Sequence, residues 1–286
     1  MHEKYQNIVD VVKADIEKVN NNLVFDFDLK SELADKLKNL LIYPSKRIRS
    51  LMTILYLRAS KIYLLPTHYQ LLACVELVHN ASLIHDDVID KSNMRRNQKT
   101  INDLFDNHLA VLSGDYLIGI ALEKLVEIGS LDVMQNFALL LQNMCRGEVN
   151  QYFDKFKKIN LQEYIDKSTQ KTASLFECAL NSSLLLASTN CDEKQSEFAI
   201  NFGLAFQIRD DLMNVLDKDN SKLSNDIQNG IYNAPYILSD ELSDGIEKTK
   251  ELLNNYVNCA KQCIEDLEDS VYKKALFELL ELIENV

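Results

Sequence analysis

Helix breakers are rare in this chain, and their scarcity limits the folds that it can adopt. Its 286 residues include 7 glycines and 3 prolines. Folds rich in strands need frequent tight turns, which draw on these two residues. Long stretches of the chain instead repeat apolar residues at the three- and four-residue spacing of an amphipathic helix. The sequence therefore predicts an all-α fold of long helices with little sheet.

The breaks between the periodic stretches divide the chain into helices. The expected helices cover residues 2–20, 29–42, 46–61, 67–90, 108–128, 131–153, 161–188 and 193–218, with one or two more between 240 and 285. Residues 219–234 are polar and are expected to form a loop. No linker, low-complexity tract or repeat interrupts this pattern, so residues 1–286 are expected to form a single domain.

Net charge, cysteine spacing and the lengths of the apolar stretches indicate which classes of protein this chain can belong to. The net charge of -12 excludes nucleic acid as an expected partner, because binding to a phosphate backbone needs a basic surface. The six cysteines show no C-x-x-C spacing, which indicates reduced thiols in a cytoplasmic protein. No stretch has the apolar length of a membrane span, and the amphipathic N-terminus lacks the apolar core of a signal peptide. The protein is therefore expected to be soluble.

Three carboxylates end the expected helix 67–90. Asp86 and Asp90 lie four residues apart, so their side chains stack on one helical face about 6 Å apart, and Asp87 flanks them. These anions repel one another, and the C-terminal end of a helix disfavours negative charge. A hard divalent cation with oxygen ligands would compensate them. Taken alone, the pattern also fits a solvated acidic helix end.

A second cluster repeats the first. Asp210, Asp211 and Asn214 have the same spacing and also follow an apolar run. Helical bundles build carboxylate metal sites from facing helices, so the two clusters are expected to face one another across a cavity with an apolar interior. Magnesium held by few protein ligands usually bridges to phosphate oxygens. Basic residues that could supply the donors for a diphosphate are Lys46, Arg47, Arg49, Arg95, Arg96, Lys171 and Lys222.

These motifs together resemble those of the trans-isoprenyl diphosphate synthases, the polyprenyl synthetase family. The matching stretches are KRIR (46–49), ELVHNASLIHDDVID (76–90), Arg95-Arg96, LSGDYL (112–117), GEVNQ (147–151), KTASLFE (171–177) and FGLAFQIRDDLMN (202–214), followed by a degenerate pattern at 225–235. The resemblance implies a bundle of long antiparallel helices around a deep apolar cavity, the isoprenoid synthase type I fold. It also implies a homodimer whose product associates with membranes.

The resemblance assigns roles to individual residues. It implies that Asp86, Asp90 and Asp210 hold Mg²⁺, with Asp87, Asp211 and Asn214 in support. The allylic diphosphate would contact Arg95, Lys171 and Lys222, while isopentenyl diphosphate would contact Lys46, Arg49, His79 and Arg96. Thr172 and Gln207 would lie beside the allylic carbon. Arg47 and His85 are expected to be surface or helix-end groups.

The chain departs from the family pattern at several positions. The departures are Pro44, Ser45, Ser50, Asn97, Asn214, Ile231 and Asn233. The last two put the diphosphate contacts around 225–235 in doubt. Asn214 still offers a carbonyl oxygen or binds a metal-bound water, so tuned rather than abolished metal binding is expected.

The resulting functional hypothesis is a Mg²⁺-dependent prenyltransferase that joins an allylic diphosphate to isopentenyl diphosphate. Ala81 and Ser82 lie one turn before Asp86, where the growing tail would pass. Their small size favours a medium- or long-chain product. The alternatives are a short-chain synthase making farnesyl or geranylgeranyl diphosphate, a subunit of a two-component synthase, and a class I terpene cyclase. A cyclase would not need the second set of basic residues.

Overall fold

The computed structural model describes residues 2–43, 45–188, 192–216 and 230–285, and this part of the chain is almost entirely helical. The helices are α1 His2–Val11, α2 Lys13–Asn21, α3 Ser31–Ile42, α4 Ile48–Ala59, α5 Pro66–Ile89, α6 Ile101–Leu104, α7 Asn107–Ile128, α8 Leu131–Phe153, α9 Leu161–Ser168, α10 Ser174–Leu186, α11 Glu193–Leu216, α13 Ala234–Leu238, α14 Leu242–Cys263 and α15 Val271–Glu284. A π-helical turn, η1, covers Thr169–Ala173, and a small hairpin pairs β1 Met94–Arg95 with β2 Gln98–Lys99.

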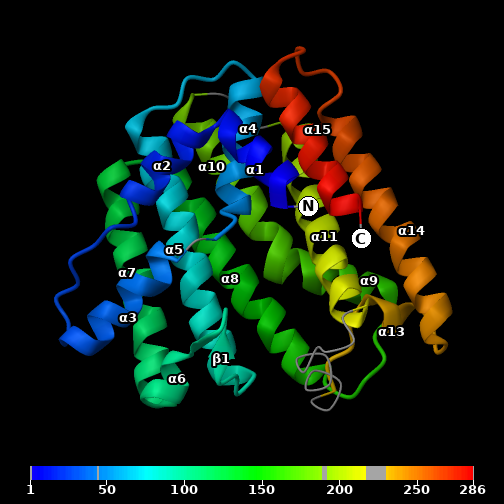
Figure 1. Ribbon diagram of the computed structural model, residues 1–286, viewed down its shortest axis with the longest axis horizontal. Helices are drawn as coiled ribbons and strands as arrows, with labels where there is room; N and C mark the ends of the chain where they lie inside the picture. Colours follow the sequence, from blue (N-terminus) through cyan, green and yellow to red (C-terminus); the bar gives the residue numbers. More distant parts are fainter. Residues whose placement is uncertain (1, 44, 189–191, 217–229, 286) are drawn as a thin grey trace.

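Helix α5 runs through the bundle and is packed along much of its length against α7 (Figure 1). Its other neighbours include α10, α2 and α4, while α11 packs between α10 and α14. The buried apolar side chains of the described residues form one continuous core. Since α5 is buried on several sides, its sequence is apolar over most of its circumference rather than along one stripe. The all-α prediction is confirmed.

The boundaries of α5 follow from local chemistry. Pro66 occupies the first turn, where a missing N–H costs nothing. The backbone N–H of Leu65 donates to Nδ1 of His68, and Nε2 of His68 lies 3.1 Å from the carbonyl oxygen of Ser183 on α10. This buried histidine therefore both caps α5 and ties its beginning to a neighbouring helix.

Three expected features differ in detail. The predicted helix 2–20 is divided at Val12, which leaves the helical conformation but stays buried, as do Ile8 and Ile16. The predicted helix 161–188 contains the turn η1, which carries Lys171 and Thr172. A π-helical turn often marks a functional site, because the extra residue redirects the side chains around it. Residues 91–107, for which the sequence predicts no helix or strand, contain the hairpin and the short helix α6.

The structure also confirms the break near residue 129. Gly129 ends α7 in the left-handed conformation (φ 75°), and Ser130 then caps α8 by accepting a hydrogen bond from the N–H of Val133. Within the described residues, no helix has the length and apolar character that a membrane crossing requires.

Candidate active site

A cavity of about 670 Å³ opens between α4, α5, α8, η1 and α11. Its lining includes most of the residues singled out in the sequence: Lys46, Arg47, Arg49, His79, Ser82, Asp86, Asp90, Arg95, Arg96, Lys171, Thr172, Gln207, Asp210, Asp211 and Asn214. Asp87 and Ala81 are not in this lining, and Lys222 lies outside the described residues. The fold thus brings together groups that are up to about 170 positions apart in the chain.

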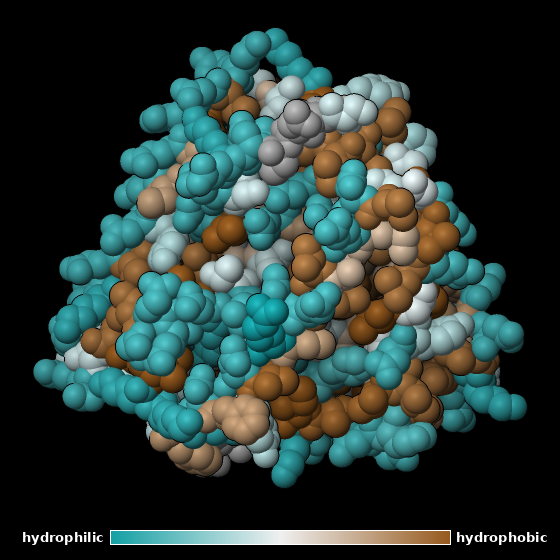
Figure 2. Space-filling model, turned by 180° about the vertical axis from the view of Figure 1, so that it is seen from behind, coloured by the Kyte–Doolittle hydropathy of each residue, from teal (hydrophilic) through white to brown (hydrophobic). Residues whose placement is uncertain are grey.

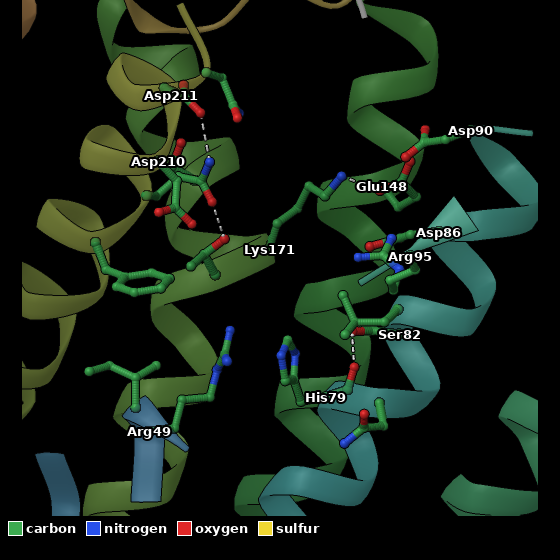
Figure 3. A pocket seen from close by; sticks show the side chains of 18 of the residues that line it. Arg49, His79, Ser82, Asp86, Asp90, Arg95, Glu148, Lys171, Asp210 and Asp211 are labelled. Atoms are coloured by element: carbon green, nitrogen blue, oxygen red, sulfur yellow. Dashed lines mark hydrogen bonds and ion pairs between the residues drawn. The ribbon is translucent and has the colours of Figure 1, made fainter. Parts of the chain in front are cut away.

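The two aspartate clusters lie on opposite walls of the cavity (Figure 3). Asp86 and Asp90 come from the end of α5, and Asp210 comes from α11. Asp87 turns away from the cavity and is only 5% exposed. Its Oδ1 accepts hydrogen bonds of 2.8 Å from both Nε and one terminal nitrogen of Arg95. Asp87 therefore holds the arginine that follows the helix.

Burial determines the electrostatics of the acidic walls. It raises the pKa of Asp86 to about 6, an effect that Lys171 opposes and Glu148 and Asp90 reinforce. Burial also raises the pKa of Asp210 to about 6, with Arg209 acting in the opposite direction. Carboxylates with raised pKa values lack sufficient positive charge nearby. An oxygen-ligated divalent cation would supply this charge.

The donor set on each wall is incomplete for a protein-only metal site. Within the described ranges, no three His, Cys, Asp or Glu side chains are grouped in a way that could hold a metal ion. The residues nevertheless fit Mg²⁺, which binds through one or two carboxylates and takes its other ligands from water and substrate phosphates. The arrangement fits an ion that arrives with a phosphorylated ligand.

Lys171 crosses the space between the two walls and pairs with Glu148 of α8 (Figure 3). The close approach of the two helices depends on Gly147, since a Cβ there would lie 2.7 Å from Cγ of Lys171. Glu148 belongs to the GEVNQ motif, which by itself predicts no role for it. The motif itself was the available signal, because its glutamate falls one turn before Gln151, which also lines the cavity.

A chain of hydrogen bonds supports the second motif. The Thr172 hydroxyl donates to Oε1 of Gln207 (2.7 Å), and Nε2 of Gln207 donates to Asp211 (2.8 Å). Asp211 also accepts from the hydroxyl of Tyr164 and the N–H of Ala234. Its oxygens therefore already have three donors, so in this structure Asp211 fixes Gln207 and the start of α13 within the cavity wall.

The basic half of the cavity lies beside α4. Arg49 is 8% exposed, its guanidinium lies 4.9 Å from the ring centre of Phe176, and its buried Nε has no hydrogen-bond partner among the described residues. Burial lowers the pKa of Arg49 to about 10, so it remains charged at neutral pH. Burial and the surrounding arginines lower the pKa of His79, which is therefore a neutral imidazole. A buried cation with an unused donor favours an anionic ligand.

The structure refines the expectation that Arg47 and His85 are surface or helix-end groups. Arg47 is not a surface group: it is 7% exposed and its guanidinium lies 3.2 Å from the carboxylate of Glu76 on α5. His85 lies between α5 and α7, where its Nε2 is 3.1 Å from the carbonyl oxygen of Val111. A Cβ at Gly114 would lie 2.2 Å from the same Nε2, so this glycine makes room for the imidazole. Both residues lie near helix ends, as expected, because Arg47 immediately precedes α4 and His85 lies in the C-terminal part of α5. Tertiary packing decides that Arg47 is buried whereas His85 remains partly exposed.

Comparison with known proteins identifies the family of this chain. The family model for polyprenyl synthetase matches residues 30–274. A prenyl transferase from Synechocystis sp. is 30% identical, with 83% of this chain and 84% of the relative covered. A chloroplastic solanesyl-diphosphate synthase 2 from Oryza sativa is 31% identical over 82% of this chain and 62% of its own length.

A solved structure of a similar protein shows that the fold is shared as well. Heptaprenyl diphosphate synthase from Staphylococcus aureus superposes with a TM-score of 0.84 at 26% identity, with 98% of both chains covered. The match therefore extends over nearly the whole bundle and includes the helices that carry both aspartate clusters. The chain is a prenyltransferase and belongs to the polyprenyl synthetase family.

Proposed function

We propose that this enzyme condenses an allylic diphosphate with isopentenyl diphosphate, releases pyrophosphate and makes a medium- or long-chain all-trans polyprenyl diphosphate. The observation that carries the proposal is the division of one cavity into two halves. Two carboxylate clusters face each other in one half, and a buried cationic group that includes Arg49 occupies the other. Two different diphosphates can therefore bind side by side.

Magnesium is the proposed cofactor. Asp86 and Asp90 on one wall and Asp210 on the other would hold it, and Asn214 would contribute an oxygen directly or through water. When bound, the metal neutralises charge on the leaving diphosphate. Lys171 and Arg95 also line the cavity near the aspartates. Each could donate a charge-assisted hydrogen bond to this diphosphate.

Lys171 would exchange one anion for another. In the structure its ammonium group forms an ion pair with Glu148. A diphosphate that enters the cavity would offer this ammonium group a second anionic partner. Thr172, the next residue along η1, directs its hydroxyl to Gln207. Oxygen atoms of this pair would stabilise positive charge at the allylic carbon as the carbon–oxygen bond breaks.

Isopentenyl diphosphate would occupy the basic half. Lys46, Arg49 and Arg96 line it, and the neutral His79 can donate one hydrogen bond without adding charge. The double bond of this substrate would attack the allylic carbon, and the proton lost afterwards would pass to the departing pyrophosphate. No side-chain nucleophile is required.

The proposed chain length is supported by small side chains and by the relatives. Solanesyl and heptaprenyl diphosphate synthases are among the similar proteins. Ser82 lines the cavity one turn before Asp86, whereas Ala81 is fully buried in the core and does not line it. The proposed tail path therefore begins beside Ser82 and Leu83 and continues into the apolar packing behind them.

A homodimer in the cytoplasm is the proposed state. Exposed apolar side chains on α7 and α8 include Leu112, Leu122, Val126 and Leu139, and apolar side chains gather over the lower part of the rear face (Figure 2). Contiguous exposed apolar surface favours a protein contact. The cysteines within the described ranges are free thiols. The long apolar product would pass into a membrane after release.

The decisive experiment is incubation with labelled isopentenyl diphosphate, farnesyl diphosphate and Mg²⁺, followed by chromatography of the dephosphorylated products. Products longer than geranylgeraniol are expected, in a metal-dependent reaction that releases one pyrophosphate per condensation. Products that end at farnesol or geranylgeraniol would support the short-chain alternative. A cyclised hydrocarbon formed from the allylic substrate alone would support a terpene cyclase.

A further inference from the structure

Arg47 connects three separate segments at the wall of the basic half. Its Nε donates to Oδ1 of Asn20 at the end of α2 (3.2 Å). One terminal nitrogen lies 3.2 Å from Glu76 of α5, and the other donates to the carbonyl oxygen of Leu41 in the last turn of α3. Each nitrogen of the guanidinium thus has an acceptor within the protein. A cation is also favourable at a helix C-terminus, where carbonyl groups lack partners.

The backbone of Arg47 is in an unusual conformation. Its φ of 44° and ψ of 39° place it in the left-handed region, immediately before α4 begins. A residue with a Cβ adopts this conformation at a cost, so other contacts must maintain it. The three contacts of the side chain provide that restraint. The conformation determines how the chain passes from Lys46 into the first turn of α4, which carries Arg49.

Glu76 completes the arrangement from the other side. It is 2% exposed, and its second carboxylate oxygen accepts a 2.8 Å hydrogen bond from the hydroxyl of Ser50. Glu76 therefore connects α5 to Arg47, two residues before Arg49, and to Ser50, the residue after it. A buried carboxylate beside several cations would weaken anion binding by its charge alone, so its presence here needs a structural reason.

We propose that Arg47 and Glu76 are a pair of positioning residues that orient Lys46 and Arg49 toward the diphosphate of the homoallylic substrate. Both residues line the cavity, but their charged groups already have partners within the protein, so neither need contact that substrate. The inference rests on the proposed function, because it concerns the half of the cavity assigned there to isopentenyl diphosphate. It assigns a role to Arg47 that differs from that of the two cations beside it.

Replacement of Glu76 by Gln gives results of opposite sign for the two possible roles of Arg47. If Arg47 were itself a ligand of the diphosphate, Glu76→Gln would remove a competing negative charge and lower the KM for isopentenyl diphosphate. If the pair positions Lys46 and Arg49, the same change weakens the restraint and raises this KM by about tenfold. The kcat and the KM for the allylic substrate should change little in the second case.

Substitutions of Arg47 separate the side chain from the backbone. Arg47→Gly accommodates the left-handed conformation but removes all three contacts, whereas Arg47→Ala removes the contacts and retains the backbone cost. Both should raise the KM for isopentenyl diphosphate, and Arg47→Ala should also lower the melting temperature further. Arg47→Lys, which keeps the charge and one donor, should restore part of the affinity. The effects of Arg47→Gly and Glu76→Gln should be less than additive in the double variant.

A matched control lies on α4, the helix that begins after Arg47. Arg58 of α4 makes two hydrogen bonds, of 3.0 and 2.8 Å, with the buried Asp15 of α2, and neither residue lines the cavity. Arg58→Met therefore removes a comparable ion pair without affecting the proposed restraint. It should lower the melting temperature but leave the KM for isopentenyl diphosphate unchanged.

Steady-state kinetics with each substrate varied in turn, together with melting temperatures, provide the test. Titration of each metal-free variant with isopentenyl diphosphate by calorimetry measures binding independently of turnover. An active wild-type enzyme with an unchanged or lower KM in Glu76→Gln, or an unchanged KM in Arg47→Gly, would overturn the positioning role. Absence of any condensation by the wild type would instead refute the proposed function, and the two failures are therefore distinct.

Discussion

The hydroxyl oxygen of Thr172 lies 2.7 Å from the side-chain oxygen of Gln207, and this contact joins the π-helical turn to the helix of the second aspartate motif. Gln207 donates in turn to Asp211, which accepts from the buried Tyr164. Two polar groups at the cavity surface are thus held in place by groups behind them. Such preorganisation matters most where charge develops during a reaction.

Replacement of Thr172 tests whether its hydroxyl acts in the reaction. Thr172→Val preserves shape but removes the donor to Gln207, and it should lower kcat about 10- to 100-fold, as expected for loss of one preorganised polar group. Thr172→Ser should keep most of the activity. Pre-steady-state measurement of the first condensation checks the result. Equal kcat values for the Val and Ser variants would contradict the assignment.

Asp86 should be required for turnover but not for folding. Asp86→Ala removes a proposed metal ligand and one of the stacked carboxylates of α5, so activity with saturating Mg²⁺ should disappear while the helical circular dichroism spectrum is retained. Asp115→Ala on the same side of the bundle is a suitable control, because Asp115 does not line the cavity. Near-normal Mg²⁺-dependent turnover by Asp86→Ala would refute the metal assignment.

The raised pKa of Asp86 also predicts an effect of pH on stability. Its pKa of about 6 exceeds the ordinary value of 3.8, so the folded protein binds the proton more tightly than the unfolded chain does. The metal-free protein should therefore lose stability as pH rises from about 4 through 6. Asp86→Asn should raise the melting temperature at pH 7.5 by about 2–4 °C, but not at pH 4. Added Mg²⁺ should reduce this difference by stabilising the wild type only.

His68 should have the opposite dependence. Burial lowers its pKa below 6.5, because the folded protein keeps the imidazole neutral between the N–H of Leu65 and the carbonyl of Ser183. A depressed pKa in a base means that stability is complete above about pH 6.5 and declines as pH falls. The melting temperature of the wild type should therefore fall more steeply between pH 7 and 5 than that of His68→Gln. Parallel curves would refute this explanation.

The adjacent arginines should affect different substrates. Arg95 pairs with Asp87, whereas the guanidinium of Arg96 lies 5.4 Å from the ring centre of Tyr43 and its residue is in the left-handed conformation (φ 51°). Arg96→Ala should raise the KM for isopentenyl diphosphate about 10- to 100-fold, and Arg95→Ala should raise that for the allylic substrate. Identical changes for both substrates would contradict the division.

Chain length should respond most directly to Ser82. Ser82→Phe places an aromatic ring at the cavity wall and should shorten the product by several isoprene units without abolishing turnover. Ala81→Phe must fit a ring into a fully buried position, so a shorter product should be accompanied by a loss of stability of about 1–3 kcal/mol. Chromatography of dephosphorylated products and thermal melts separate the two effects. An unchanged product from both variants would refute this tail path.

The sequence by itself determined the helical architecture and most of the cavity lining. Helix periodicity and the scarcity of breakers depend on local chemistry, so α5, α7, α8 and α11 lie within a few residues of their predicted boundaries. The aspartate spacings likewise predicted two clusters, because residues four apart always share a helical face. The ordered motifs then identified the family.

Only the tertiary structure decided the orientation and burial of individual side chains. Asp87 belongs to the same acidic string as Asp86, yet helix geometry and the pairing with Arg95 direct it away from the cavity. Arg47 stands between two cavity cations in the sequence, but contacts with three separate segments bury it. These outcomes depend on which segments meet in space. The neighbours of a residue along the chain do not specify which segments it will meet. Those contacts form between helices that are far apart in the sequence.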